Sequence, residues 1–146
     1  DLISPNASLY FPDPEFIFTR IFEPKNRNPN MAPSGQTSLV LEIPCQAGDD
    51  TWNLSVSEIS KRAISPLVEL GWFSRDEIID VTMKRISHAY PKLDIAAQEA
   101  RVRILNYLRR FSNLRLNGRQ GLFQYTHIHD QIRNSRKIIE SFKEQS

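Results

Sequence analysis

The sequence predicts an α+β fold with a small, mostly antiparallel sheet and about four helices. Residues 1–52 hold short alternating runs of apolar and polar side chains, interrupted by prolines, which is typical of strands. After residue 53 the apolar side chains recur at helical spacing, and Ser or Asp stands where helices would begin. At 146 residues the chain is long enough to bury a core.

Three strands are expected in the first part of the chain, over residues 8–11, 16–22 and 38–45. Three antiparallel strands are the simplest arrangement. Cys45 ends the third apolar run, so it is expected to be a small buried residue rather than a nucleophile. Residues 24–35 are rich in Pro and Asn and are expected to form a connection without regular structure.

Helices are expected over residues 55–70, 74–80, 94–112 and 130–143. Ser55 and Glu58, and again Ser74 and Glu77, have the spacing of a capping box. Pro66 predicts a kink or a break in the first helix. Two further strands are expected, over residues 81–90 and 113–117.

The segment from Gly118 to Asp130 contains the residues that indicate most clearly a ligand-binding site. Gly118 and Gly121 lack side chains where a backbone could approach a ligand closely, and Gly121 is expected to take a positive φ. The alternating run after them predicts a strand. A helix is expected to begin at about Asp130, whose side chain would cap it. The free N–H groups of its first turn could bind an electron-rich group.

This segment resembles the C-terminal motif of the amine-oxidase-like flavoproteins, which include protoporphyrinogen oxidase-like proteins and UDP-galactopyranose mutase. Their pattern is roughly Gly-Arg-x-Gly-x-Phe/Tyr-x-Tyr-x-x-Met-Asp, and the matching residues are Gly118, Arg119, Gly121, Phe123 and Tyr125. Ile128 and His129 replace the usual Met and Asp. Residues 18–26, 37–45 and 88–91 resemble the central part of the same proteins, in the same order.

The resemblance implies the C-terminal part of a longer, FAD-dependent oxidoreductase, here called the parent protein. Residues 1–112 would be its substrate-side domain, and residues 113–146 a strand, turn and helix that contact the flavin. The five glycines hold no Gly-x-Gly-x-x-Gly motif, so the dinucleotide-binding part would lie N-terminal in the parent. The isolated chain is therefore expected to be inactive and not to hold FAD.

The resemblance also assigns site residues. Those expected to contact FAD are Gly118, Arg119, Gly121, Leu122, Phe123, Ile128 and His129. Those expected to contact a small-molecule substrate are Arg20, Tyr90, Tyr125 and His127. Arg119 could pair with a flavin phosphate or steady the reduced flavin. The catalytic residues and the substrate stay open.

Two alternatives remain. The first is a flavoenzyme like UDP-galactopyranose mutase, acting on a sugar nucleotide, although His127 stands where that mutase carries an Asp. The second is a binding module without catalysis, if the chain is complete as given. A strand-helix unit with the Gly-x-Gly-x-x-Gly motif upstream would decide for the flavoprotein.

Other function classes find little support. Residues 84–146 carry 13 Lys/Arg against 5 Asp/Glu, but without the interleaved aromatics typical of nucleic-acid binding. His127 and His129 would share one strand face, yet no third ligand stands at a suitable spacing, so no metal site is expected. No apolar run approaches a membrane span and no signal peptide is visible, which predicts a cytoplasmic location without a transmembrane segment.

Overall fold

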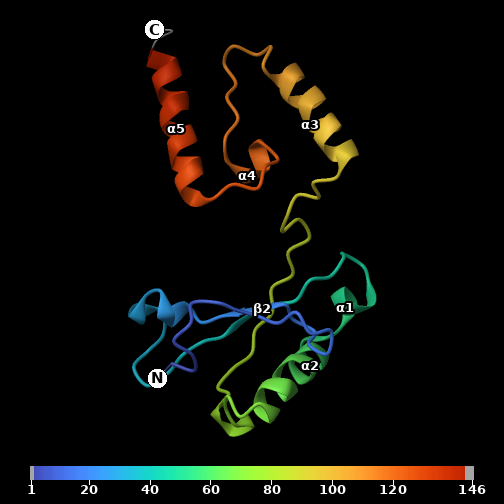
Figure 1. Ribbon diagram of the computed structural model, residues 1–146, viewed down its shortest axis with the longest axis vertical. Helices are drawn as coiled ribbons and strands as arrows, with labels where there is room; N and C mark the ends of the chain where they lie inside the picture. The colour runs from blue at the N-terminus through green and yellow to red at the C-terminus, as the bar shows by residue number, and fades with distance from the viewer. Residues whose placement is uncertain (1, 144–146) are drawn as a thin grey trace. The chain divides into compact units, whose positions relative to one another are not determined.

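The structure is a computed structural model that describes residues 2–143. It combines helices with a three-stranded sheet, so the expected α+β class is confirmed. The chain forms two compact units, residues 1–87 and residues 88–146 (Figure 1). The division that the sequence suggested after residue 112 does not coincide with this boundary, because the helix over residues 95–108 belongs to the second unit.

The sheet of the first unit is antiparallel, as expected, and its strand order is β1-β2-β3. Its strands are shorter than predicted: β1 is Leu9–Tyr10, β2 is Arg20–Phe22 and β3 is Val40–Glu42. Because β3 ends at Glu42, Cys45 lies beyond the strand and is exposed. The expectation of a buried Cys45 is wrong, since alternation alone does not show where a strand ends.

Two short 3-10 helices lie in the connection between β2 and β3, at Pro24–Asn26 (η1) and Pro29–Met31 (η2). The expectation of no regular structure there is wrong. Each helix begins with a proline, whose fixed φ suits a first helical position and whose missing N–H costs nothing there. The side chain of Asn28 accepts a hydrogen bond from the N–H of Asn30 at 3.0 Å and so caps the second one.

The main helix of the first unit, α2 (Val56–Glu69), begins at the predicted capping box. Ser55 Oγ accepts the Glu58 N–H at 3.2 Å, and Glu58 Oε2 accepts the Ser55 N–H at 2.9 Å. Of the kink or break expected at Pro66, the break is absent, because the helix continues through Pro66 to Glu69. A shorter helix, α1 (Asp50–Asn53), was not predicted, although Asp49 caps it through the N–H of Trp52 at 2.7 Å.

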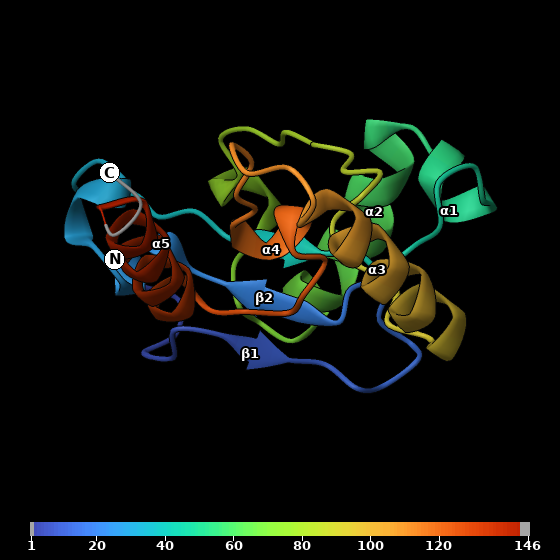
Figure 2. The same cartoon turned by 90° about the horizontal axis from the view of Figure 1, so that it is seen from above.

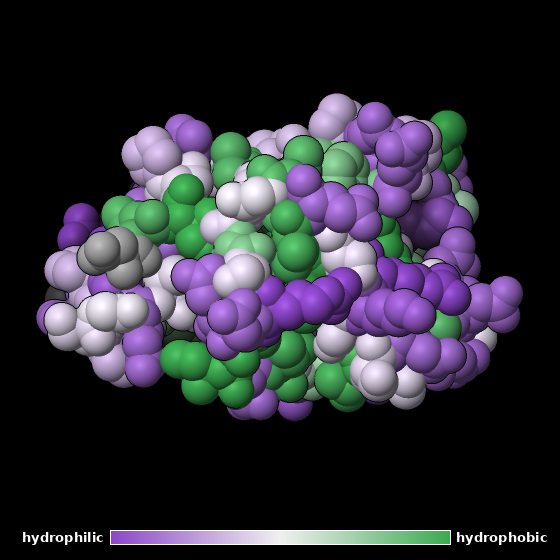
Figure 3. Space-filling view, turned by 90° about the horizontal axis from the view of Figure 1, so that it is seen from below, coloured by the Kyte–Doolittle hydropathy of each residue, from purple (hydrophilic) through white to green (hydrophobic). Residues whose placement is uncertain are grey.

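The core lies where α2 packs on one face of the sheet (Figures 1 and 2). Its buried apolar residues are Phe18, Ile21, Ala63 and Leu67. Phe11 adds edge contacts, with ring centroids 5.0 Å from both Phe16 and Phe18. Among the described residues, every buried one lies in the first unit. Figure 3 shows one face of the structure, on which both hydrophilic and hydrophobic side chains are exposed.

Glu23 is a buried carboxylate, 2% exposed, that no sequence pattern singled out. It accepts hydrogen bonds from the N–H groups of Ile3 and Ser4 at 3.1 and 3.2 Å. Asn26 Nδ2 donates at 3.2 Å, and the Thr37 hydroxyl donates as well. Because all four donors point at one side chain, Glu23 fastens the N-terminal segment and the β2–β3 connection to the sheet.

Residues 81–90 are not a strand, contrary to the prediction. A 3-10 helix, η3 (Arg75–Glu77), precedes this segment at the second predicted capping box. Arg85 then fixes it by donating to the carbonyl oxygens of Trp52 and Leu54 at 2.7 and 2.5 Å. These two hydrogen bonds from the Arg85 side chain fix the segment without a strand partner.

The second unit contains α3 (Ile95–Leu108), α4 (Gly118–Gly121) and α5 (Ile128–Lys143). Asp94 caps α3 by accepting the N–H of Ala97 at 2.8 Å, as expected. The strand predicted over residues 113–117 is absent, because no described segment pairs with it. No helix within residues 2–143 is long and apolar enough to cross a bilayer.

The capping box of α2 is expected to make stability depend on pH. The Ser55 side chain, followed by its backbone N–H, lowers the pKa of Glu58 from its ordinary 4.5. The stabilisation is therefore complete above the unfolded pKa and is lost as the pH falls through the lower, folded pKa. Ser55→Ala should cost about 1 kcal/mol near neutral pH and reduce this acid-induced loss, as measured by thermal unfolding followed by circular dichroism.

The matched control for this prediction is Ser57→Ala, an exposed serine in the first turn of the same helix. It should leave both the stability and its acid dependence unchanged. An equal acid-induced loss in the Ser55→Ala and wild-type proteins would show that the capping box does not contribute.

Candidate functional site

The Gly118–Gly121 segment forms one helical turn, α4, rather than the bend into a strand that the sequence predicts. The turn closes with two hydrogen bonds: Phe123 N–H donates to the Gln120 carbonyl at 3.2 Å, and Gln124 N–H to the Arg119 carbonyl at 3.0 Å. This is the Schellman pattern of a helix end. Phe123 stands where that pattern usually has glycine, and it takes a φ of 47°.

The two glycines of the turn differ in their requirements. Gly118 has a φ of 79°, and a Cβ there would lie 3.8 Å from Gln131 Oε1 of α5. Gly121 does not have a positive φ, so that expectation is wrong. A Cβ at Gly121 would meet no atom within 4 Å. The backbone conformation at position 118 therefore favours glycine. At position 121 the missing side chain leaves the main chain open to a close approach.

Three of the expected site residues meet next to this turn. The guanidinium carbon of Arg119 lies 4.3 Å from the ring centroid of Tyr125 and 5.6 Å from that of Tyr90. The two tyrosine rings stack, with centroids 5.6 Å apart and an angle of 20° between their planes. Both rings are more than half exposed. We call Tyr90, Arg119 and Tyr125 the Arg–Tyr cluster.

Arg119 holds an unused donor within the cluster. Its Nη2 atom is buried and has no hydrogen-bond partner among the described residues. The salt bridges within these residues do not include Arg119, so no carboxylate offsets its charge there. Such a cation beside two aromatic rings suits a planar or anionic ligand group, because the cluster offers charge and stacking surface together.

The start of α5 follows the cluster, two residues before the predicted position. The His127 carbonyl accepts N–H bonds from Asp130 and Gln131, both at 3.1 Å, and Asp130 Oδ2 accepts the His127 N–H at 3.2 Å. Asp130 therefore helps to cap the helix from its third position, since the helix begins at Ile128 instead of at Asp130. The imidazoles of His127 and His129 stack at 5.6 Å, and Ile128 between them is 77% exposed.

The structure places the remaining expected residues in other surroundings. Arg20 lies in β2 of the first unit, where it forms an ion pair with Glu42 of β3. The strand expected after Gly121 is absent, so Leu122 and Phe123 belong to the turn itself. No group of three or more His, Cys, Asp or Glu side chains within residues 2–143 is arranged to hold a metal ion.

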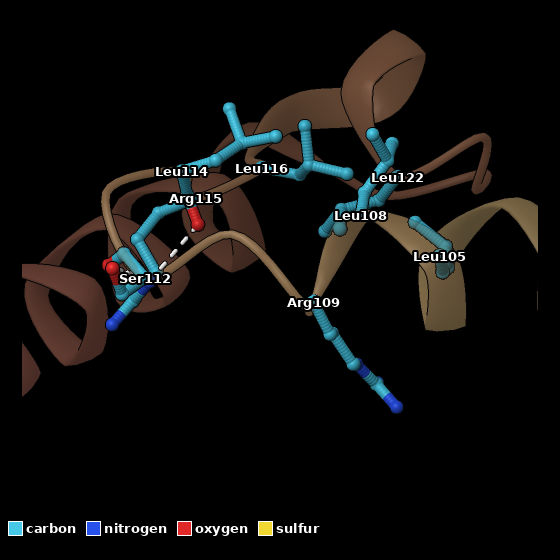
Figure 4. Close-up of a pocket in the computed structure, with 8 residues that line it drawn as sticks. All are labelled: Leu105, Leu108, Arg109, Ser112, Leu114, Arg115, Leu116 and Leu122. Carbon is cyan, nitrogen blue, oxygen red and sulfur yellow. Dashed lines mark hydrogen bonds between the residues drawn. The ribbon is translucent and has the colours of Figure 1, made fainter.

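A leucine-lined hollow beside the turn was not predicted (Figure 4). It has a volume of about 590 Å³ and is lined by Leu105, Leu108, Arg109, Ser112, Leu114, Arg115, Leu116 and Leu122. Arg109 points away from the leucines, and Arg115 donates to the Ser112 and Leu114 carbonyls at 2.8 and 3.0 Å. In the sequence, the alternation of Leu114 and Leu116 with polar residues places both leucines on one face. In the structure these leucines line the hollow together with residues of α3 instead of lying in a sheet.

Arg101 joins α3 to the turn. Its Nε atom donates to the Leu122 carbonyl at 2.6 Å, directly after α4. The site is thus held by a helix on one side and by the start of α5 on the other. Arg101 itself was not recognised from the sequence, because an arginine on a helix surface carries no distinguishing pattern.

Comparisons of the chain with protein-family models, with curated proteins and with solved structures found no match. The interpretation of the Arg–Tyr cluster therefore rests on its own chemistry and on the motif residues that it contains.

Proposed function

We propose that the chain is the C-terminal portion of an FAD-dependent oxidoreductase of the amine-oxidase-like superfamily. In this proposal residues 113–146 contribute the last flavin contacts and residues 1–112 form the substrate side. The observation that carries the proposal is the Arg–Tyr cluster directly beside an uncovered glycine. Arg119, Gly121 and Tyr125 come from one motif, and the fold brings Tyr90 to them from a distant part of the chain.

The residues of the site fit one edge of a flavin. Gly121 leaves backbone open to close approach, because nothing stands where its side chain would be. Arg119 has a buried donor atom without a partner in the described structure. The first turn of α5, at Ile128 and His129, offers N–H groups that have no intrahelical acceptor. These groups favour an electron-rich ring edge or a phosphate.

In the proposed reaction, bound FAD would accept a hydride from an organic substrate. The residues of this chain would orient the ring system and exclude water. Arg119 would offset negative charge near the ring, and Tyr90 and Tyr125 would form a wall for ring or substrate. The remaining contacts would come from the N-terminal dinucleotide-binding part of the parent protein, which we propose to be cytoplasmic.

A mutase acting on a sugar nucleotide is the second candidate, because Arg20 and Arg119 both stand at motif positions of that enzyme class. His127 in place of the mutase Asp speaks against it. A binding module without catalysis would apply if the 146 residues are the complete product. The flavin content of the full-length protein separates this last candidate from the two flavoenzymes.

We expect that the isolated 146-residue chain does not retain FAD, whereas the full-length parent does. One turn and one helix start give too few contacts to hold a dinucleotide, whose diphosphate normally requires a glycine-rich turn and helix of its own. The measurement is the visible absorbance of each protein after incubation with FAD and gel filtration.

Arg119→Ala in the full-length protein should lower the bound flavin at least tenfold, while Arg103→Ala, at an exposed position on α3, should not change it. A stable yellow complex of the isolated chain would contradict the first expectation. A colourless full-length protein would contradict the proposed function itself.

A further inference from the structure

We propose that the leucine-lined hollow of the second unit binds a free fatty carboxylate, with the aliphatic chain among the leucines and the carboxylate at Arg109. The lining residues all fall within residues 105–122 of the second unit. The hollow shares only Leu122 with the residues expected to contact FAD. The inference goes beyond the proposed function and does not rest on it.

The hollow is built by segments that the backbone holds together. Leu105 and Leu108 stand one turn apart on α3 and so lie on the same side of that helix. The segment that follows α3 contributes a second pair of leucines, and its bend is closed by the Phe111 N–H, which donates to the Leu108 carbonyl at 3.2 Å. Arg101 Nε donates to the Leu122 carbonyl at 2.6 Å and ties the last lining residue to α3. The fold therefore forms the walls of the hollow without a ligand.

The interior of the hollow is aliphatic. Its lining includes five leucines and no aromatic side chain, and four of these leucines are half-buried, so the described side chains do not close it. Its volume of about 590 Å³ lies within the range of about 300–1,000 Å³ that is typical of small-molecule sites. Leucines bury methylene groups but offer no ring on which an aromatic ligand would stack. The lining therefore favours a flexible aliphatic chain.

The charge at the rim favours an anionic head group. The lining includes two arginines and no Asp or Glu among the described residues. Arg109 extends from the rim away from the leucines (Figure 4), and the salt bridges within residues 2–143 do not include it. Its Nη1 atom donates to Asn106 Oδ1, a neutral acceptor, at 3.3 Å. A carboxylate at the rim would form a shorter, charge-assisted bond with this guanidinium.

The second arginine of the rim has a different part. Arg115 donates to the Ser112 and Leu114 carbonyls at 2.8 and 3.0 Å, and its guanidinium carbon lies 5.1 Å from the ring centroid of Phe142. These contacts fold its side chain back on the segment that carries it. Arg115 thus adds positive charge beside the hollow, whereas Arg109 is the residue that would bind the carboxylate directly.

The test titrates the 146-residue chain with sodium decanoate below its micelle concentration and follows the amide chemical shifts. Saturable shifts are expected within residues 105–122. Octanoate, which is shorter by a pair of methylenes, should bind about tenfold more weakly, because each buried methylene changes the affinity about threefold to fourfold. Butyrate should give no saturable shift, because its chain is too short to fill the hollow.

Arg109→Gln separates the head group from the chain. It should weaken decanoate binding about threefold to fivefold at low ionic strength, as expected for an exposed ion pair, and leave the binding of uncharged 1-decanol unchanged. Arg103→Gln removes the same charge from an exposed position of α3 that does not line the hollow, and it should change neither affinity.

Leu114→Trp tests the chain site. Leu114 is 36% exposed, so a larger side chain there should fill the hollow without straining the backbone. It should weaken the binding of decanoate and of 1-decanol alike, by about tenfold or more, which corresponds to the loss of a few buried methylenes. Circular dichroism of the same sample should show unchanged helix content.

The wild-type titration decides first. No saturable shift with decanoate, or shifts spread evenly over both units, would overturn the proposal whatever the variants do. Equal losses in Arg109→Gln and Arg103→Gln would overturn it too, because net charge alone would then attract the anion. So would a chain that sediments with phosphatidylserine vesicles but does not respond to monomeric decanoate. None of these measurements requires flavin, whereas failure of the flavin proposal would appear as a colourless full-length protein.

Discussion

In the full-length protein, Gly121→Val is expected to remove most of the bound flavin while leaving the fold intact. The substituted side chain would meet no atom of this chain within 4 Å at its Cβ, and the backbone of Gly121 does not have a positive φ. The new methyl groups would therefore occupy the space proposed for the ligand instead of straining the turn. Absorbance of bound flavin and circular dichroism of the same sample measure the two effects separately.

Gly118→Val is the matched comparison for this prediction. Gly118 has a φ of 79°, so a branched side chain there should cost about 1–2 kcal/mol of stability. Its effect should appear in the unfolding curve as well as in the flavin content. Full flavin occupancy in Gly121→Val would show that the glycine pair is an ordinary turn without a role in flavin binding. Loss of both the fold and the flavin would show that Gly121 is required for the structure.

The second large effect is expected at Glu23. Glu23→Ala should lower the free energy of unfolding by about 3 kcal/mol, because several partly buried donors would lose their acceptor at once. The N–H groups of Ile3 and Ser4 are among these donors. The measurement is the urea midpoint at neutral pH, followed by tryptophan fluorescence, since Trp72 packs against the core of the same unit.

Two further variants make the Glu23 prediction specific. Glu23→Gln keeps the shape but turns an amide N–H₂ toward donors, so its loss of stability should be substantial and smaller than that of Glu23→Ala. Glu69→Ala removes an exposed carboxylate at the end of α2 and should change the stability by less than about 0.5 kcal/mol. A Glu23→Ala protein as stable as Glu69→Ala would show that water replaces the lost acceptor.

The parts of the fold that depend on local signals could be predicted from the sequence. Ser55 and Asp94 cap helices where the capping patterns stand, because a cap involves only residues within one turn. The antiparallel arrangement of the sheet could also be predicted, because consecutive short strands joined by loops usually pair with each other.

The predictions that failed depended on a partner or on a strand end. Alternation over residues 113–117 reports which side chains share a face, but a strand also requires a second strand to pair with, and none of the described segments provides one. The same reason applies to residues 81–90, which Arg85 holds through two carbonyl groups. At Gly118 the helical turn replaced the expected strand entry, because glycine permits several backbone conformations and specifies none.

The candidate site was predictable residue by residue but not as a group. The resemblance pointed to Arg119, Tyr90 and Tyr125 separately, and the stacking between them comes from tertiary packing. The ion pair between Glu42 and Arg20 could not be foreseen, because it depends on the exact register of two strands. The leucine-lined hollow likewise combines residues from α3 and from the segment that follows it.

The placement of every described buried residue in the first unit has a thermodynamic consequence for the second. Residues 88–143 expose apolar side chains on both long helices, among them Val102, Ile104, Ile132 and Ile139. A ligand or partner that binds these helix faces only in the folded state stabilises the folded state by mass action. The stabilisation is about 2.7 kcal/mol when the free concentration of the partner is a hundred times its Kd. The melting temperature of this half of the chain is therefore a function of its surroundings, rather than a constant of its sequence.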